Sequence, residues 1–170
     1  LMTMGGVPFI YYGEEIGQTG KKPDENIREP FDWYKNKQGK YMTNWMRRSS
    51  VKEKNTIEND GISVEEQKGI ESSLLEHYRK LIELRKNEKL MSNYNLDKIE
   101  FNNNKLYSYC KYDENSKIIV ILNLDKRASF EIDLNKKFPD KKIVDIYNNK
   151  IIDSKKTIEN LGFMLLKIAD

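Results

Sequence analysis

The fold is decided by residues 6–17, which read GVPFIYYGEEIG. Residues 6–12 carry no charge and are rich in β-branched and aromatic side chains, and Gly13 separates them from two adjacent carboxylates. A short apolar run between turn residues is typical of a strand that is buried on both faces, as parallel strands are. Pro8 cannot donate a hydrogen bond to a β-ladder, so it belongs among the first residues of such a strand. We therefore predict a buried parallel strand over residues 6–12 that ends in a polar loop.

A long polar connection follows this strand, from Gln18 to about Asp60. Long loops in compact domains are usually functional or disordered, and disordered segments are poor in aromatic residues. This connection carries five aromatic side chains: Phe31, Trp33, Tyr34, Tyr41 and Trp45. In a β/α barrel, the residues just beyond the C-terminal end of a strand line the mouth of the active site. We therefore predict an ordered functional loop.

Two capping patterns predict the N-termini of helices after the loop. Ser63 precedes Glu66 by three residues, and Ser73 precedes Glu76 by the same spacing, which is the pattern of a capping box. Beyond Ser73, apolar residues recur at spacings of three and four, which predicts an amphipathic helix over residues 73–86 that packs against a sheet.

The hydrophobic period changes from 3.6 to 2 beyond about Asn87, and turn residues separate the apolar runs. Such short strands are typical of an antiparallel sandwich or an open barrel, and we predict a β-sandwich. We expect one domain over residues 1–87 and an all-β C-terminal domain over residues 88–170. The predicted strands are 106–112, 118–124, 130–134, 143–147, 150–152 and 163–168.

Three of these motifs resemble a known family. Residues 6–17 resemble the eighth barrel strand of the α-amylase family of glycoside hydrolases. Residues 27–33, IREPFDW, resemble the Arg-x-Pro-x-x-Trp segment of its α-amylase and oligo-glucosidase branches, and residues 73–85 resemble its last barrel helix. The resemblance implies an α/β plus all-β fold, in which the last β/α unit of a TIM barrel (eighth strand, long loop and last helix) precedes the β-sandwich. A whole barrel needs about 250 residues, so we expect the 170-residue chain to be a fragment.

Glycoside hydrolysis uses a pair of carboxyl groups that flank the scissile bond. Glu14 and Glu15 are adjacent at the end of a strand, so their side chains point to opposite faces and cannot form such a pair. The resemblance implies that the catalytic carboxylates lie upstream of Leu1. We therefore expect no catalytic residue in this chain and no activity from the chain alone. The full-length parent is expected to be a retaining hydrolase of α-glucosidic bonds in starch-like glucans or maltooligosaccharides.

Arg28 is the first candidate for substrate binding. Its planar guanidinium can form paired hydrogen bonds to a carboxylate or to neighbouring sugar hydroxyls. The resemblance implies a place near the glucose unit on the non-reducing side of the cleaved bond. The alternative is a structural arginine that pins its own loop to Asp24, Glu25 or Glu29.

Trp33 is the second, weaker candidate. A tryptophan ring can stack on a sugar ring, but a tryptophan in a loop is more often a packing anchor. Both interpretations are open from the sequence.

Composition excludes several classes of function. Thirty basic and 27 acidic residues give a net charge of +3, and the two signs are interleaved, which argues against a nucleic-acid partner. No apolar run is long enough to span a membrane. The single cysteine, Cys110, excludes an internal disulfide and a thiolate metal cluster. We expect no metal or cofactor in this chain; the resemblance allows calcium in the parent. The sequence indicates no cellular compartment.

Two further function classes are open. The chain could be a non-catalytic carbohydrate-binding module, or a structural β-domain without a ligand. We also expect residues 6–17 to mediate self-association or to adopt a non-barrel conformation, because the barrel strands that would flank them are absent from the chain. An unpaired apolar strand edge is a template for pairing with another copy.

Overall fold

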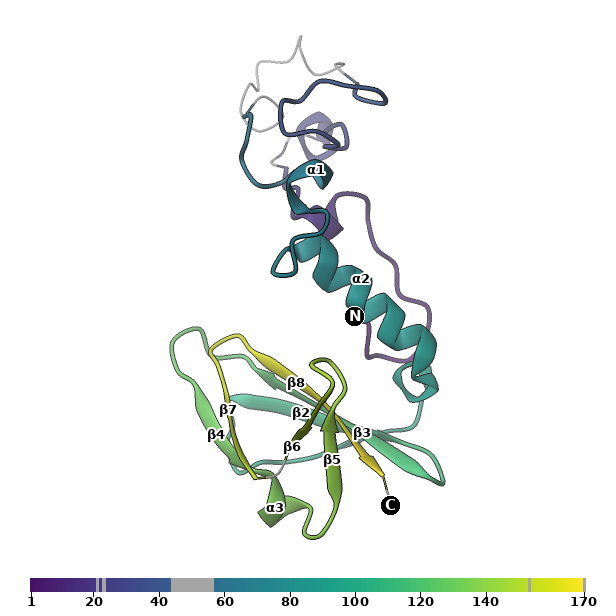
Figure 1. The fold of residues 1–170 in the computed structure, drawn as a ribbon, viewed down its shortest axis with the longest axis vertical. Coiled ribbons are helices and arrows are strands. Elements are labelled where there is room, and N and C mark those ends of the chain that lie inside the picture. The colour runs from purple at the N-terminus through teal and green to yellow at the C-terminus, as the bar shows by residue number, and fades with distance from the viewer. Residues whose placement is uncertain (21, 23, 44–56, 153, 170) are drawn as a thin grey trace. The chain divides into compact units, whose positions relative to one another are not determined.

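The computed structural model describes residues 1–20, 22, 24–43, 57–152 and 154–169. The chain divides into two compact units. One contains Leu1–Pro8 and Leu81–Asp170, and the other contains Phe9–Lys80. The second boundary lies inside the helix α2, Leu74–Asn87 (Figure 1). The predicted domain boundary between residues 87 and 88 remains a prediction.

The unit formed by Leu1–Pro8 and Leu81–Asp170, which we call the β-rich unit, contains two antiparallel sheets. A six-stranded sheet has the order β1-β2-β3-β8-β5-β6, and β4 pairs with β7 in a second sheet of two strands (Figure 1). The strands are β1 (Leu96–Lys98), β2 (Leu106–Tyr112), β3 (Ser116–Asn123), β4 (Phe130–Asp133), β5 (Lys142–Asp145), β6 (Lys150–Ile152), β7 (Lys155–Ile158) and β8 (Phe163–Ala169).

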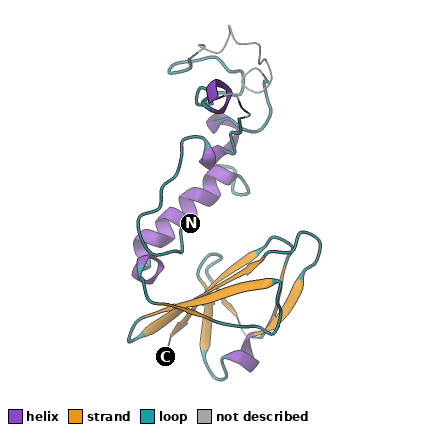
Figure 2. Cartoon of the chain, turned by 180° about the vertical axis from the view of Figure 1, so that it is seen from behind, coloured by secondary structure: helices purple, strands orange, loops and turns teal. Residues whose placement is uncertain are grey.

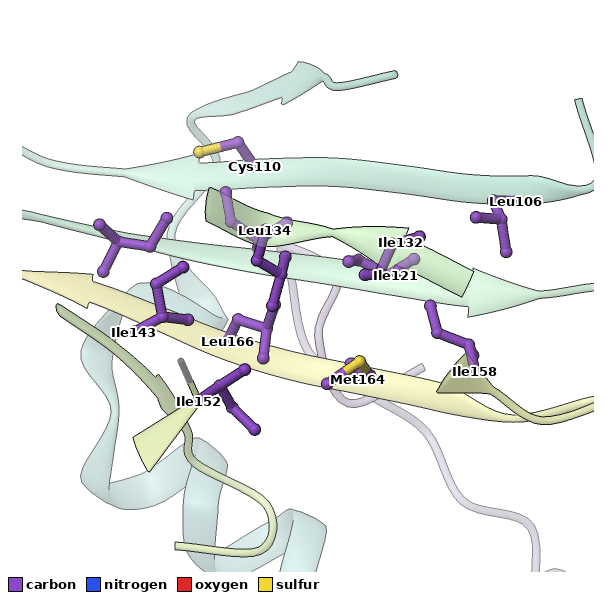
Figure 3. Close-up of a cluster of buried hydrophobic side chains, with 12 residues drawn as sticks. Leu106, Cys110, Ile121, Ile132, Leu134, Ile143, Ile152, Ile158, Met164 and Leu166 are labelled. Carbon is purple, nitrogen blue, oxygen red and sulfur yellow. The ribbon is translucent and has the colours of Figure 1, made fainter. Parts of the chain in front are cut away.

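The two sheets share one hydrophobic core, which Figure 3 shows in close-up. Ile132 and Ile158, from the two-stranded sheet, point toward side chains of the six-stranded sheet such as Ile121 and Leu166. Alternate side chains of β3 face the opposite side, where Leu90 and other residues form a second cluster. Strand β3 is therefore buried on both faces, which explains its continuous apolar run.

The second cluster depends on a short 3-10 helix, η4, at Lys89–Ser92. Leu90 and Met91 of this helix pack on the sheet with Ile118, Val120 and other residues of the adjacent strands. Since all of these side chains are almost completely buried, the β-rich unit holds apolar cover on both sides of its central strands.

All six predicted strand positions contain a strand, and each observed end lies within two residues of the predicted one. The sequence prediction missed β1 and β7, because neither short segment shows a run of apolar residues. It also extended β4 to Leu134, where the chain instead begins the short helix α3, Leu134–Lys137 (Figure 2). The Asp133 carboxylate accepts a hydrogen bond from the Lys136 N–H and caps that helix.

The helices after the long loop begin where the sequence predicts. Helix α1 (Val64–Gln67) has the complete capping box of Ser63 and Glu66. Helix α2 begins after Ser73, whose hydroxyl accepts from the Glu76 N–H at 3.3 Å. The Glu76 carboxylate accepts instead from the Gly69 N–H at 2.8 Å, so only half of the second capping box forms.

The predicted parallel strand at residues 6–12 is wrong for this structure. The segment adopts no regular secondary structure, and none of the described strands pairs with it. Val7 is 82% exposed and Phe9 85% exposed. A parallel strand of this composition needs neighbours on both sides, and the described part of the chain supplies none.

The side chains of Arg85 and Lys111 bind main-chain carbonyl oxygens near the N-terminus, and we call these two side chains the carbonyl clamp. Arg85 donates to the carbonyl oxygens of Met2, Met4, Gly6 and Met91 at 2.5–2.9 Å. Lys111 is fully buried and donates to the carbonyl oxygens of Thr3 at 3.0 Å and Met91 at 2.8 Å. Burial, followed by the charge of Arg85, lowers the pKa of Lys111. The clamp fixes residues 1–6 to the β-rich unit.

None of the described helices combines the length and the hydropathy that crossing a bilayer requires.

Candidate functional site

The site begins at a tight turn directly after the apolar segment. Gly13 and Gly17 have φ values of 89° and 76°, which favour glycine, and they bound a 3-10 turn, η1, at Glu14–Ile16. The Glu14 carboxylate accepts from the Tyr11 N–H at 3.1 Å, and the Glu15 carboxylate accepts from the Gly13 N–H at 2.8 Å. Both carboxylates therefore bind the backbone of their own turn.

Two hydrogen bonds join this turn to the segment around residue 29. The Tyr12 hydroxyl donates to the Glu29 carbonyl at 3.2 Å, and the Gln18 amide donates to the Pro30 carbonyl at 2.7 Å. A small hollow lies between the two segments, lined by residues that include Tyr11, Tyr12, Gln18 and Glu29. Burial, with a contribution from Tyr11, raises the pKa of the Tyr12 hydroxyl, so this group stays a neutral donor.

Arg28 lies beside the hollow, between two of its lining residues, Ile27 and Glu29. Its side chain is 63% exposed, and its contact with Asp24 is a single ion pair at 3.5 Å. An exposed pair of this length contributes little to stability. The structure therefore pairs Arg28 with one of its expected structural partners and leaves much of the guanidinium open to solvent. Its assignment to substrate binding remains a prediction.

Trp33 makes an edge-to-face contact with Phe31, with ring centroids 4.6 Å apart. The indole is still 41% exposed. The Trp33 main chain is held by the Glu65 N–H, which donates to its carbonyl at 3.0 Å. The packing expected of an anchor is present, and the predicted contact with a sugar remains a prediction.

A buried ion cluster holds the loop beyond Trp33. The Lys37 ammonium donates to the Asp32 carboxylate and, at 3.2 Å, to the Asp60 carboxylate. Asp32 and Lys37 are each less than a tenth exposed, and the second oxygen of Asp32 has no hydrogen-bond partner among the described residues. Burial raises the pKa of Asp32 against the opposing effect of Lys37. Burial also disfavours charge on Lys37, but its carboxylate partners outweigh this effect and raise its pKa.

Gln67 anchors the other end of the loop. Its side-chain amide donates to the carbonyls of Ile16, Gly61 and Ile62 at 2.7–3.2 Å, and its oxygen accepts from the Leu75 N–H at 3.0 Å. One buried side chain thus ties the η1 turn, the end of the loop and the start of α2 into one unit.

Among the described residues, no three acidic, histidine or cysteine side chains lie close enough to hold a metal ion. The two acidic groups of the buried cluster already share the Lys37 ammonium. The calcium that the resemblance allows in the full-length parent remains a prediction.

The sequence did not reveal the ion cluster. Asp32, Lys37 and Asp60 lie 5 and 23 residues apart in a loop without a regular period, so no pattern relates them. The contacts of Tyr12 and Gln18 were missed for the same reason. Trp45, one of the aromatic residues that favoured an ordered loop, lies outside the described residues.

A profile of the family described as "Alpha amylase, catalytic domain" matches residues 1–93 of the chain. This match covers the η1 turn, the loop that carries Arg28 and Trp33, and helix α2. The chain belongs to the alpha-amylase family. The resemblance seen in the three sequence motifs is thereby confirmed.

Individual relatives agree with this assignment. The chain is 34% identical over 167 residues to Alpha-amylase 3 of Dictyoglomus thermophilum, covering 98% of this chain and 32% of that protein. It is 33% identical over 129 residues to the 4-alpha-glucanotransferase of Thermotoga neapolitana, covering 73% and 28%. The chain thus spans about a third of the length of the curated relatives it matches.

Solved structures share the fold over nearly the whole chain. The alpha-amylase from H. orenii superposes with a TM-score of 0.70 at 31% identity, covering 99% of this chain and 33% of that chain. The trehalose-6-phosphate hydrolase of Bacillus licheniformis superposes with a TM-score of 0.75 at 19% identity, covering 100% and 37%. The second likeness concerns the fold alone.

Proposed function

We propose that this chain is the C-terminal part of a retaining glycoside hydrolase that acts on the α-glucosidic bonds of starch-like glucans or maltooligosaccharides. Residues 1–87 form the last β/α unit of its catalytic barrel, and residues 88–170 form a β-sandwich C-terminal domain. The catalytic carboxylates belong to the segment upstream of Leu1. In the parent, residues 6–12 form the eighth barrel strand, between neighbours that this chain lacks.

One observation carries the proposal. The catalytic-domain profile ends at residue 93, three residues before β1, the first strand of the β-rich region. The part of the chain that matches the catalytic domain therefore contains the loop site, and the part that follows contains the antiparallel sheets. This division supports a role for the loop as one wall of the substrate site.

Within that wall, Arg28 binds substrate. Its guanidinium has planar donors that match neighbouring sugar hydroxyls, and among the described residues a single weak ion pair engages it. Trp33, in the same segment, is 41% exposed and is assigned a weaker role in contacting a sugar ring.

A second candidate function is α-glucan transfer, in which a sugar hydroxyl replaces water as the acceptor. The observation in its favour is the 33% identity to a 4-alpha-glucanotransferase. Analysis of the parent's products from maltotriose separates the two functions, because transfer yields longer oligosaccharides and hydrolysis yields only shorter ones.

The proposed substrate binding by Arg28 is tested by comparing two arginine variants of the full-length parent. Arg28→Ala and Arg79→Ala each remove an exposed arginine with one local ion pair, at 3.5 Å to Asp24 and 3.3 Å to Glu76 respectively. Loss of a hydrogen bond to substrate costs about 1.5–3 kcal/mol, so Arg28→Ala should lower kcat/KM roughly ten- to a hundred-fold. Arg79→Ala should leave it unchanged.

Equal kcat/KM values for the two variants would assign Arg28 a purely structural role. The chain alone should show no hydrolysis of starch, maltooligosaccharides or aryl α-glucosides, because both carboxylates of the mechanism are missing. Turnover by the purified chain above a buffer blank would overturn that assignment and with it the placement of the catalytic groups upstream.

A further inference from the structure

A hollow of about 810 Å³ lies at the edge of the β-rich unit where β1 joins β2. Its lining comes from residues 98–100 and 102–104, from the first residues of β2, and from Leu124. A volume of this size falls within the range of about 300–1,000 Å³ that is typical of small-molecule sites.

The loop that borders the hollow is fixed before any ligand arrives. The Ile99 N–H donates to the Ser108 carbonyl at 3.2 Å, and the Ser108 hydroxyl donates to the Ile99 carbonyl at 2.7 Å. At the other end of the loop, Asn103 accepts from the Lys105 N–H at 2.9 Å and from the Leu106 N–H at 3.2 Å. A preformed wall lowers the entropy cost of binding.

Tyr107 offers an aromatic surface in this hollow. It is 49% exposed, although the residues on either side of it in β2 are buried. Tyr109, the next residue on the same face, is buried and bonds to Thr3, so it cannot contact a ligand in the same way. Its ring lies 5.9 Å from that of Tyr107 and supports it from one side.

The polar groups of the hollow are amides rather than unpaired charges. Lys98 and Glu100 neutralise one another in an ion pair at 2.7 Å. The side-chain amides of Asn102 and Asn104 make no hydrogen bond to any described residue. Each amide has two donor hydrogens and an acceptor oxygen, which match the hydroxyl groups of a sugar.

We propose that this hollow is a binding site for an α-glucan segment, with Tyr107 packed against one sugar ring and the asparagine amides bonded to its hydroxyls. An exposed aromatic ring, neutral charge and free amides together favour an uncharged polyhydroxyl ligand over an anion or an apolar molecule. The choice of an α-linked glucan rests on the proposed function. The site would hold the polymer on the β-rich part of the enzyme.

The test titrates the 170-residue chain with maltoheptaose and follows the side-chain amide resonances of Asn102–Asn104 by NMR. These resonances should shift on binding, and Tyr107→Ala should weaken the affinity about tenfold, the loss expected when an aromatic contact is removed. Tyr94→Ala is the matched control, because Tyr94 is also exposed but does not line the hollow. It should leave the affinity unchanged. Thermal unfolding of each variant establishes that the β-rich unit is still folded.

Three results would overturn the proposal: no shift of the asparagine amides, equal affinities for Tyr107→Ala and Tyr94→Ala, or equal binding of the β-linked cellohexaose. None of them bears on Arg28. Failure of the proposed function would appear separately, as equal kcat/KM for the two arginine variants of the parent.

Discussion

Replacing Lys37 by methionine should destabilise the unit formed by Phe9–Lys80. The ammonium lies between the Asp32 and Asp60 carboxylates, and Asp32 is buried with one oxygen already unpartnered. Removing one member of a buried ion pair leaves an uncompensated charge and costs about 3–5 kcal/mol. That is a large part of the stability of an ordinary small domain, about 5–15 kcal/mol.

The same reasoning predicts a partial rescue. In the double variant Asp32→Asn, Lys37→Met, the buried carboxylate is neutral, and Asp60 keeps its bond from the Ile62 N–H. At least about 2 kcal/mol should be regained relative to the single variant, because the cost arises from the unpaired charge rather than from the lost contact. Lys35→Met is the matched control, since Lys35 is an exposed lysine in the same loop and should change stability by less than about 0.5 kcal/mol.

Urea unfolding followed by tryptophan fluorescence measures the effect. The two tryptophans of the chain are at positions 33 and 45 of the sequence, between Phe9 and Lys80, so the fluorescence signal comes from this stretch of the chain. With an m-value of about 1–2 kcal/mol per molar, a loss of about 3–5 kcal/mol should lower the Lys37→Met midpoint by roughly 1.5–5 M. The reasoning is refuted if the midpoint matches that of Lys35→Met, or if the double variant is no more stable than the single one.

Two further outcomes are expected. Arg85→Lys should accelerate amide hydrogen exchange in residues 1–6, because one ammonium cannot reach the four carbonyl oxygens that Arg85 binds. Arg79→Lys is the control, and equal exchange rates in the two variants would contradict the role of the carbonyl clamp. We also propose that the exposed apolar segment pairs with a second copy of the chain, so the double variant Phe9→Lys, Tyr11→Lys should convert an oligomer into a monomer with a folded β-rich unit. Sedimentation that shows a concentration-independent monomer for the wild-type chain would rule this out.

Regular elements were predictable because a periodic pattern specifies each of them. The spacing in residues 73–86 predicted α2, and apolar runs separated by turn residues predicted six of the eight described strands. The short polar strands β1 and β7 carry no such pattern; their pairing depends on partners far along the sequence. Periodicity therefore identified most strands of the core but missed β7, although its Ile158 is buried in that core.

Residues 6–12 show a different limit of sequence reasoning. Their composition suits a parallel strand buried on both faces, but a strand exists only where neighbouring strands accept and donate its hydrogen bonds. The strand propensity of seven residues can be estimated from their sequence, but their pairing with other strands cannot. In this structure the segment is largely exposed and pairs with none of the described strands.

The candidate site was predictable only in part. The IREPFDW segment drew attention to Arg28 and Trp33, and Asp24 was among the partners expected for Arg28. The buried contacts that shape the loop were not predictable. The bonds of Gln67 and Lys37 join residues across an irregular chain path, which no local pattern encodes.

The carbonyl clamp has a consequence for how this stretch can vary between related proteins. Within the described part of the chain, the hydrogen bonds of Arg85 and Lys111 go to main-chain oxygens, which every type of residue carries. These bonds therefore depend on the path of the chain and not on the identity of its side chains. A substitution at the exposed Met4 leaves each acceptor where it was. Gaining or losing one residue in this stretch would displace every acceptor on one side of the change by one position, about 3.8 Å along the chain. Selection here should therefore act on insertions and deletions more strongly than on exposed substitutions.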